Sequence, residues 1–219
     1  MQKRKIVFGD YNTAVHGWTL TKWKLGAAEE KTNYIEKVGG DGSWDVSTAL
    51  TDGIPRYRDR VLTATFESSE GTRLEREATI RHMINSLDGR RLDIRLPDDV
   101  SHHINGKVHV AREYNDLAHA AVTVTAVCGP WKLANLEKVT TLAAAEHPQK
   151  VLLVNEGRRA VVPEIKVDGA AVLAYGGSAL ELTAGTYQWP DLLLTPGLHE
   201  LTYSGTGSLV ITYREAVLE

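Results

Sequence analysis

The chain has 219 residues, of which 42% are hydrophobic and 24% are charged, and its formal net charge at pH 7 is -3. These are the proportions of a folded globular protein, which argues against intrinsic disorder and against a membrane protein. The small excess of carboxylates gives the chain no overall attraction to nucleic acid or to an anionic membrane surface.

The N-terminal segment, MQKRKIVFGD, begins with basic residues, but its apolar run stops at Gly9 and Asp10. Because a signal peptide needs a longer apolar core, we expect no export by that route. No other apolar run approaches the roughly 18 to 20 residues that span a bilayer. The one cysteine, Cys128, excludes an internal disulfide, and its place at the end of AAVTVTAVC predicts a buried structural thiol. These features fit synthesis in a reducing cytoplasm.

Strand patterns dominate the sequence. In YRDRVLTATFE, residues 57–67, a row that includes Arg60, Leu62 and Phe66 alternates with a second mixed row, which predicts a strand with neither face fully dry. Similar runs are YIEKV, LDIRL, HAAVTVTAV, KVLLV, EIKV, HELTY and LVITY. Clusters of Gly, Asp, Asn and Pro that are typical of turns separate these runs. The predicted fold class is therefore mainly β.

One segment predicts a helix instead, over about residues 72–88. Thr72 and Glu75 have the spacing of a capping box, in which each side chain binds a free amide of the first helical turn. Gly89 stands where a left-handed C-terminal residue is favoured. The apolar residues at helical spacing are Leu74, Ala78, Met83, Ile84 and Leu87, and the charged outer face holds Arg73, Glu77 and Arg81.

The stretch PDDVSHHINGKVHV, residues 97–110, concentrates histidines and aspartates. Asn105-Gly106 is a strong signal for a two-residue hairpin turn, and in that register His102 faces His109 across the strands. A shared metal would need a third ligand, and Asp98 would lie roughly 13 Å from His102 along an extended strand. We therefore predict a hairpin over residues 101–111 and no metal site.

Residues 138–150, KVTTLAAAEHPQK, lack strand alternation and contain His147-Pro148, where a helix is disfavoured, so we interpret them as a linker. The turn signals NEG, VDG, YGG, TAG, TPG and SGTG then recur at the spacing of a small β-sandwich. The predicted organisation is a first domain over residues 1–140, a linker over 141–149 and a second domain over 150–219.

Motifs for catalysis or cofactor binding are absent from the sequence, which has no G-x-S-x-G, H-E-x-x-H, P-loop or calcium loop. The adjacent carboxylates Glu29-Glu30 and Asp98-Asp99 would point to opposite faces of a strand rather than toward each other. We therefore expect no catalytic residue, no cofactor and no enzymatic activity. The five tryptophans suit either core packing or a carbohydrate-binding face: Trp18, Trp23, Trp44, Trp131 and Trp189.

The order of several short motifs is specific. They are R-x-R in the strand before the helix, L-x-G at 87–89, L-P-D-D and the hairpin at 96–110, N-E-G with P-x-I-x-V-x-G at 155–169, and G-L-H-E-L-x-Y-x-G-x-G-x-L-x-I-x-Y-R-E at 197–215. In this order the sequence resembles, over nearly its whole length, the distal tail protein (Dit) family of long, non-contractile-tailed bacteriophages, the siphophages.

The resemblance implies an N-terminal β-sandwich with one α-helix and a protruding β-hairpin, joined to a C-terminal galectin-like β-sandwich. It implies a structural protein of the virion, at the distal end of the tail, whose first domains form a homo-hexameric hub ring with a channel for DNA. The implied partners are the tail tube protein, the tail-associated tip protein and receptor-binding or other adsorption proteins docked on the C-terminal domain. Neither membrane insertion nor specific nucleic-acid binding is expected.

A closed ring of identical subunits needs a heterologous interface that repeats around its axis. We hypothesise that the hairpin over residues 101–111 crosses the subunit boundary, because a lone hairpin cannot bury apolar residues on both of its faces. The residues assigned to this inter-subunit hairpin are His102, Ile104, Asn105, Gly106, Val108 and His109.

Two other functions are weighed against this one. A lectin-like carbohydrate-binding protein would stack sugar rings on Tyr175, Tyr187 and Trp189 near the loops of the second domain. A metal-dependent hydrolase built on His102, His109 and the nearby aspartates lacks a third ligand on the same face.

Overall fold

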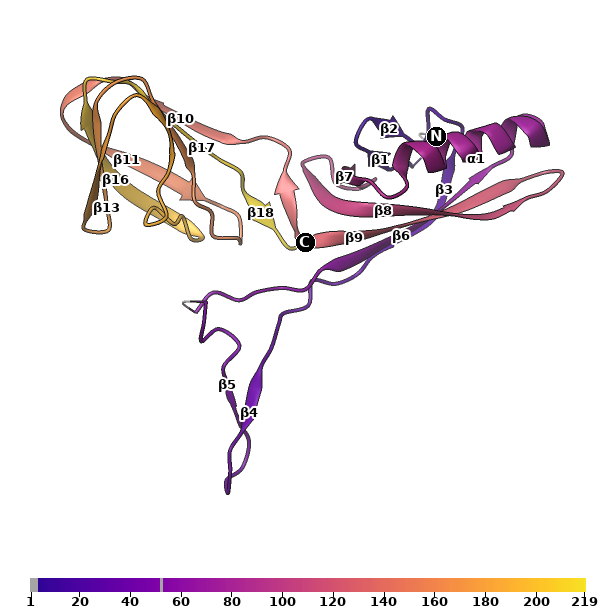
Figure 1. Ribbon diagram of the computed structural model, residues 1–219, viewed down its shortest axis with the longest axis horizontal. Coiled ribbons are helices and arrows are strands. Elements are labelled where there is room, and N and C mark those ends of the chain that lie inside the picture. Colours follow the sequence, from indigo (N-terminus) through magenta and orange to yellow (C-terminus); the bar gives the residue numbers. More distant parts are fainter. Residues whose placement is uncertain (1–3, 52) are drawn as a thin grey trace. The chain divides into compact units, whose positions relative to one another are not determined.

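The computed structural model describes residues 4–51 and 53–219. The chain divides into two compact units, of which the first ends at Lys132 and the second spans Leu133–Glu219. Strands dominate both units (Figure 1), and the predicted mainly β class is confirmed. In the part of the chain that is described, no helix is long and apolar enough to cross a membrane.

The first unit is built on one sheet whose strands follow the order β2-β1-β7-β8-β9-β6-β3. The bounds are β1 Val7–Phe8, β2 Tyr11–Asn12, β3 Thr19–Leu25, β6 Arg60–Ser68, β7 Arg91–Arg95, β8 His102–Asn115 and β9 Ala120–Ala134. Strands β8 and β9 lie in the middle of the sheet and are its longest members, with 14 and 15 residues. The edge strand β3 pairs only with β6 along this path.

Helix α1, Arg73–Leu87, packs on one face of this sheet. Its predicted start is confirmed, because the Glu75 N–H donates to the Thr72 hydroxyl and the Thr72 N–H donates to the Glu75 carboxylate. After the helix ends, Gly89 takes a φ of +73°, a left-handed conformation that favours glycine.

The apolar face of α1 differs from the predicted one. Leu74 is 82% exposed, whereas Ile80, Met83 and Leu87 are buried. Arg76 shares the buried row because its guanidinium donates to the carbonyls of Gly71, Asp116 and Leu117. A buried cation whose terminal nitrogens bond carbonyl oxygens is tolerated, and apolar periodicity alone does not reveal such a residue.

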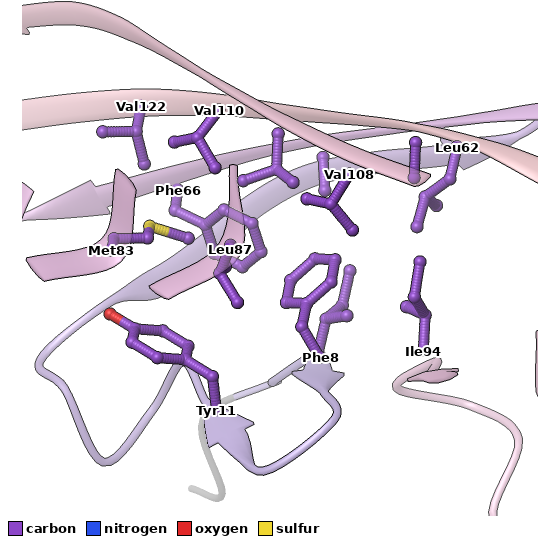
Figure 2. Packing of buried hydrophobic residues seen from close by; sticks show 14 of the residues in the cluster. Phe8, Tyr11, Leu62, Phe66, Met83, Leu87, Ile94, Val108, Val110 and Val122 are labelled. Carbon is purple, nitrogen blue, oxygen red and sulfur yellow. The ribbon is translucent and has the colours of Figure 1, made fainter. Parts of the chain in front are cut away.

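The helix and the sheet enclose a single core in the first unit (Figure 2). Phe8 and Phe66 meet edge to face, with ring centroids 6.3 Å apart. The side chains that Figure 2 labels in this core are Phe8, Tyr11, Leu62, Phe66, Met83, Leu87, Ile94, Val108, Val110 and Val122. These labelled core side chains therefore come from β1, β2, β6, β7, β8, β9 and α1.

The prediction that β6 has no fully dry face is wrong. Arg60, Leu62, Ala64 and Phe66 are all at most 2% exposed. Arg60 fits this buried row because its Nε donates to the Gly26 carbonyl at 2.6 Å and its Nη1 to the Pro130 carbonyl at 3.4 Å. The presence of an arginine in the alternating pattern of β6 therefore did not mean that this face of the strand is exposed to solvent.

Residues 27–59, which we call the arm, connect β3 to β6. Its outer part is a two-stranded antiparallel ribbon of β4, Tyr34–Glu36, and β5, Ser43–Asp45 (Figure 1). Backbone hydrogen bonds from Lys31 to Arg56 and from Arg58 to Glu29 continue the pairing toward the sheet. The sequence identified YIEKV as a strand, but it did not predict this ribbon.

The second unit is a β-sandwich of two four-stranded sheets, in the orders β10-β17-β12-β15 and β11-β16-β13-β14. Residues from both sheets, among them Leu153, Leu173, Ile165 and Ile211, belong to one buried cluster. The bounds of these strands are β10 Lys138–Leu142, β11 Ala145–Asn155, β12 Glu164–Val167, β13 Ala171–Tyr175, β14 Ser178–Leu182, β15 Gly185–Gln188, β16 Gly197–Gly205 and β17 Leu209–Tyr213. The last strand, β18 Ala216–Val217, belongs to neither of these two sheets and pairs with β9.

The interpretation of residues 138–150 as a linker is wrong, and with it the linker over 141–149. Strand β10 pairs with β17, and β11 begins at Ala145 and pairs with β16. The register of β11 shifts between Ala145 and Gln149, the segment that contains Pro148. A proline is tolerated at such an irregularity, because no hydrogen bond between the strands is lost there. Pro148 therefore interrupts the alternation in the sequence but does not end the strand. The second unit accordingly starts at Leu133 rather than at residue 150.

Candidate interaction surfaces

The predicted hairpin over residues 101–111 does not form. These residues belong to the continuous strand β8, and Asn105 and Gly106 pair with Asp93 and Leu92 of β7. Glycine is needed here for a different reason, since a Cβ at Gly106 would lie 2.5 Å from Cys128 Sγ. Gly106 thus marks a close approach between two strands and not a turn.

The pairing of His102 with His109 is also wrong. On one strand, side chains seven positions apart point to opposite faces. His102 Nδ1 lies 3.1 Å from Asp99 Oδ1, and His109 Nδ1 lies 2.8 Å from Asp88 Oδ1. Each histidine therefore has its own carboxylate partner, and no cluster of three metal-ligating side chains occurs within residues 4–51 and 53–219.

Ile104 and Val108 lie in the core of their own unit, with 0% and 1% of their surface exposed. Side chains buried in this way have no surface to offer a neighbouring subunit. The basis for assigning the inter-subunit contact to His102, Ile104, Asn105, Gly106, Val108 and His109 is therefore gone. Replacing Ile104 with Asp would unfold the unit rather than report on assembly.

Asp99 ties the start of β8 to the end of the first unit. Its Oδ1 accepts the N–H groups of Ser101 and His102, and its Oδ2 lies 3.4 Å from Lys132 Nζ. Partial burial would by itself raise the pKa of Asp99, but the hydrogen bonds from His102 and the nearby cations outweigh it and lower the pKa. These contacts show that Asp99 and His102 of the 97–110 stretch serve structure.

The predicted burial of Cys128 is confirmed. Burial raises the pKa of its thiol to about 11, so the side chain stays protonated at neutral pH. It therefore acts as a core side chain rather than a nucleophile.

The aromatic side chains weighed for sugar stacking are engaged within the second unit. Trp189 is 7% exposed and its indole N–H donates to Asp191. The Tyr175 hydroxyl is 2.8 Å from His199 Nδ1, and the Tyr187 hydroxyl donates to the Thr183 carbonyl. An apolar groove between β13, β14 and β16 is lined by Ala171, Val172, Leu182 and their neighbours, with no aromatic side chain.

The arm carries the clearest exposed apolar surface that was not predicted from the sequence. None of its described residues is buried, although several are large and apolar: Tyr34 and Trp44 are each 59% exposed and Leu50 is 98% exposed. The only signal in the sequence is a strand-like YIEKV followed by the glycine-rich turn GGDG, which is compatible with a short hairpin.

The fold and these surfaces together define a class of protein. It is a two-unit, mainly β chain in which the polar clusters described above make structural contacts and the remaining candidate features are exposed surfaces. No protein-family model matches the sequence, and no curated protein is detectably similar to it. Among solved structures, the chain is similar to the Dit protein (gp 19.1) of phage SPP1, with a TM-score of 0.68. The identity is 14%, and the alignment covers 96% of this chain and 98% of that one. SPP1 Dit is described as a paradigm of the hub adsorption apparatus in phages that infect Gram-positive bacteria.

Proposed function

We propose that this protein is a structural component of a bacteriophage tail tip, a hub of the distal tail protein kind. The observation that supports this most is the extent of the likeness to SPP1 Dit, which includes 96% of this chain and therefore both units. A protein that shared only one widespread β-sandwich with a hub would not align over nearly all of both chains. The proposal assigns no reaction to the chain.

In the proposed assembly, six copies form a ring through their first units, and the ring joins the tail tube to the adsorption apparatus. The galectin-like second units would face outward and bind receptor-binding or other adsorption proteins, while the tail-associated tip protein binds the far side of the ring. The central channel would pass DNA without holding it. The protein would be made in the host cytoplasm and reside at the distal end of the siphophage tail.

Sugar binding by stacking has less support. Trp189 is buried and the hydroxyls of Tyr175 and Tyr187 are hydrogen-bonded within the second unit. We therefore do not propose a lectin-like function for this protein.

The test is the solution mass of the purified chain, measured by light scattering with and without its tail tube protein, followed by negative-stain images. We expect particles that contain six copies of the chain, with a central hole. A chain that stays monomeric under both conditions would contradict the proposed ring.

A further inference from the structure

Three rings join the N-terminal loop, residues 13–17, to helix α1. The His16 ring of this loop stacks on Tyr11, with ring centroids 4.2 Å apart and an interplanar angle of 15°. His82 of α1 is exposed, and its ring centroid lies 5.0 Å from that of His16 and 5.7 Å from that of Tyr11. Because Tyr11 belongs to the core of the first unit (Figure 2), the cluster connects that core, through the loop, to the surface of the helix.

This contact differs from those of His102 and His109, each of which has an aspartate partner. Within residues 4–51 and 53–219, neither His16 nor His82 forms an ion pair with a carboxylate, and the contacts of their rings are with each other and with Tyr11. A proton on each ring would therefore place two like charges side by side without a counter-ion. Such a pair is unfavourable, and histidine is the side chain that can gain its charge near neutral pH.

The charged groups around the pair do not cancel this repulsion. Asp10 and Arg90 line the same pocket as His16, and the Glu70 carboxylate faces the residue that follows His16. The residues three and four positions from His82, which share its side of α1, are uncharged: Ala78, Thr79, Asn85 and Ser86. The pKa of His16 is lowered, first by burial and then by the charge of His82, so the two carboxylates do not reverse the effect.

Few other contacts hold the loop on the helix. Its backbone hydrogen bonds are local: the Gly17 N–H donates to the Ala14 carbonyl, and the Trp18 N–H donates to the Thr13 carbonyl. In the described part of the chain, none of the hydrogen bonds of the loop reaches α1. A segment with few tertiary contacts can open by itself while the rest of the unit stays folded.

Two buried polar atoms next to the loop also favour its opening. The Tyr11 hydroxyl and the Trp18 indole N–H are buried, and neither has a hydrogen bond of normal geometry to a described residue. Trp18 offsets only part of the effect of burial, which raises the pKa of Tyr11 to about 12. Buried polar groups without partners cost free energy, and an opening that admits water lowers that cost. The closed loop therefore depends on the contact between the rings.

We infer that the contact between His16 and His82 is a pH-sensitive latch, which holds the N-terminal loop on α1 while the rings are neutral and releases it when both are protonated. A single proton is tolerated, because a cationic His16 is attracted to the face of the Tyr11 ring. Since the pKa of His16 is lowered in the closed state, that state binds fewer protons than the open one. Acid therefore favours the open loop, starting near the ordinary histidine pKa of about 6.5. The latch belongs to a single chain and does not depend on the proposed ring.

The first test is amide hydrogen exchange of the full chain at pH 7 and pH 5, measured by NMR and corrected for the intrinsic exchange rates. We expect protection of the Gly17 and Trp18 amides to fall several-fold in acid while the amides of α1 stay protected. His82→Gln removes the second charge and should keep the loop protected at pH 5. His147→Gln changes an exposed histidine of the second unit and should respond like wild type. Equal responses of wild type and His82→Gln would overturn the inference.

The second test separates the charge of His82 from its ring. His82→Phe keeps an aromatic ring that cannot take a proton, so the loop should stay closed in acid and the NMR titration midpoint of His16 should rise. Added salt, about 0.5 M, should raise the wild-type midpoint in the same direction, because it screens exposed like charges. If His82→Phe opens over the same pH range as wild type, the charge of His82 is not the cause and the latch is contradicted. A His16 midpoint that neither substitution moves would contradict it as well.

Discussion

At the scale of single residues, polar side chains around β8 connect it to the elements beside it. Asp88, the residue that follows α1, is an example: its Oδ1 accepts the Val110 N–H at 2.9 Å and lies 2.8 Å from His109 Nδ1. The hydrogen bond from the Val110 amide is the main cause that lowers the pKa of the Asp88 carboxyl; burial opposes it, and the hydrogen bond and charge of His109 add to the lowering. The charged form therefore fixes the end of the helix to the middle of the sheet.

Removing this carboxylate should destabilise the first unit in a pH-dependent way. We expect Asp88→Ala to reduce the free energy of unfolding by roughly 0.5–1 kcal/mol at pH 7, since the group is partly exposed and its hydrogen bonds are screened. Because the folded pKa is lowered, the contribution is present above the unfolded pKa of about 4 and is lost as pH falls through the folded value. Urea unfolding, followed by the circular dichroism of α1 between pH 7 and pH 3, measures both effects.

Asp88→Asn is the matched control, because it keeps the acceptor oxygen and removes only the charge. Its stability should lie between that of wild type and Asp88→Ala at pH 7, and the difference from wild type should shrink in acid. A penalty for Asp88→Ala that stays constant down to pH 3 would show that the charge contributes nothing.

At the scale of elements, the contact between β8 and β9 decides the conformation of a stretch whose local sequence favours a turn. Gly106→Ala would place a methyl group 2.5 Å from Cys128 Sγ and 3.1 Å from the Val127 carbonyl. Overpacking of this kind should lower the free energy of unfolding by about 1–3 kcal/mol. The measurement is denaturant unfolding of the first unit.

A double mutant identifies the cause. Cys128→Ala removes the nearest clashing atom, so Gly106→Ala should be less harmful in that background than in wild type, with a coupling energy of about 0.5 kcal/mol or more. Additive effects of the two substitutions would mean that the sulfur is not the obstacle. The result would then favour the backbone of β9, which also lies close to Gly106.

Local signals predicted some elements and misled on others. The capping box of Thr72 and Glu75 is complete within one turn of chain, and it placed the start of α1 correctly. Asn105-Gly106 is an equally strong turn signal, but Gly106 is required by Cys128, which is far away in sequence. Pro148 suggested a linker, although β11 accommodates it at a register shift against β16. In both cases a strand from elsewhere in the chain determined the structure.

The candidate surfaces were harder to predict than the fold for a related reason. An exposed apolar residue is recognised only when its surroundings are known, and Trp44 looks the same in sequence as the buried Trp18. Burial likewise decided against Trp189 as a stacking platform. The mainly β class can be predicted from period-2 patterns in the sequence. The exposed apolar surface of the arm can be recognised only in the structure, where nothing packs on it.

At the scale of the whole molecule, the boundary between the units determines which fragment can fold. The Ala134 N–H donates to the Glu215 carbonyl, and β10 pairs along its full length with β17. Residues 133–219 should therefore fold alone, whereas residues 150–219, the second domain expected from sequence, lack β10 and the start of β11. Without β10, the edge of β17 is left unpaired, which favours aggregation.

Trp189 is the one tryptophan in either fragment, so its fluorescence reports folding of the second unit directly. We expect fragment 133–219 to be monomeric and to unfold cooperatively in urea, with Trp189 moving from a buried to a solvated environment. Fragment 150–219 should be less stable by roughly 3 kcal/mol, or should aggregate, because it exposes Leu209 and Ile211 beside the missing strand. Equal stability of the two fragments would place the boundary near residue 150 and make β10 dispensable. That result would leave residues 133–149 free to act as a linker, and the second unit could then move independently of the ring that the first units are proposed to form.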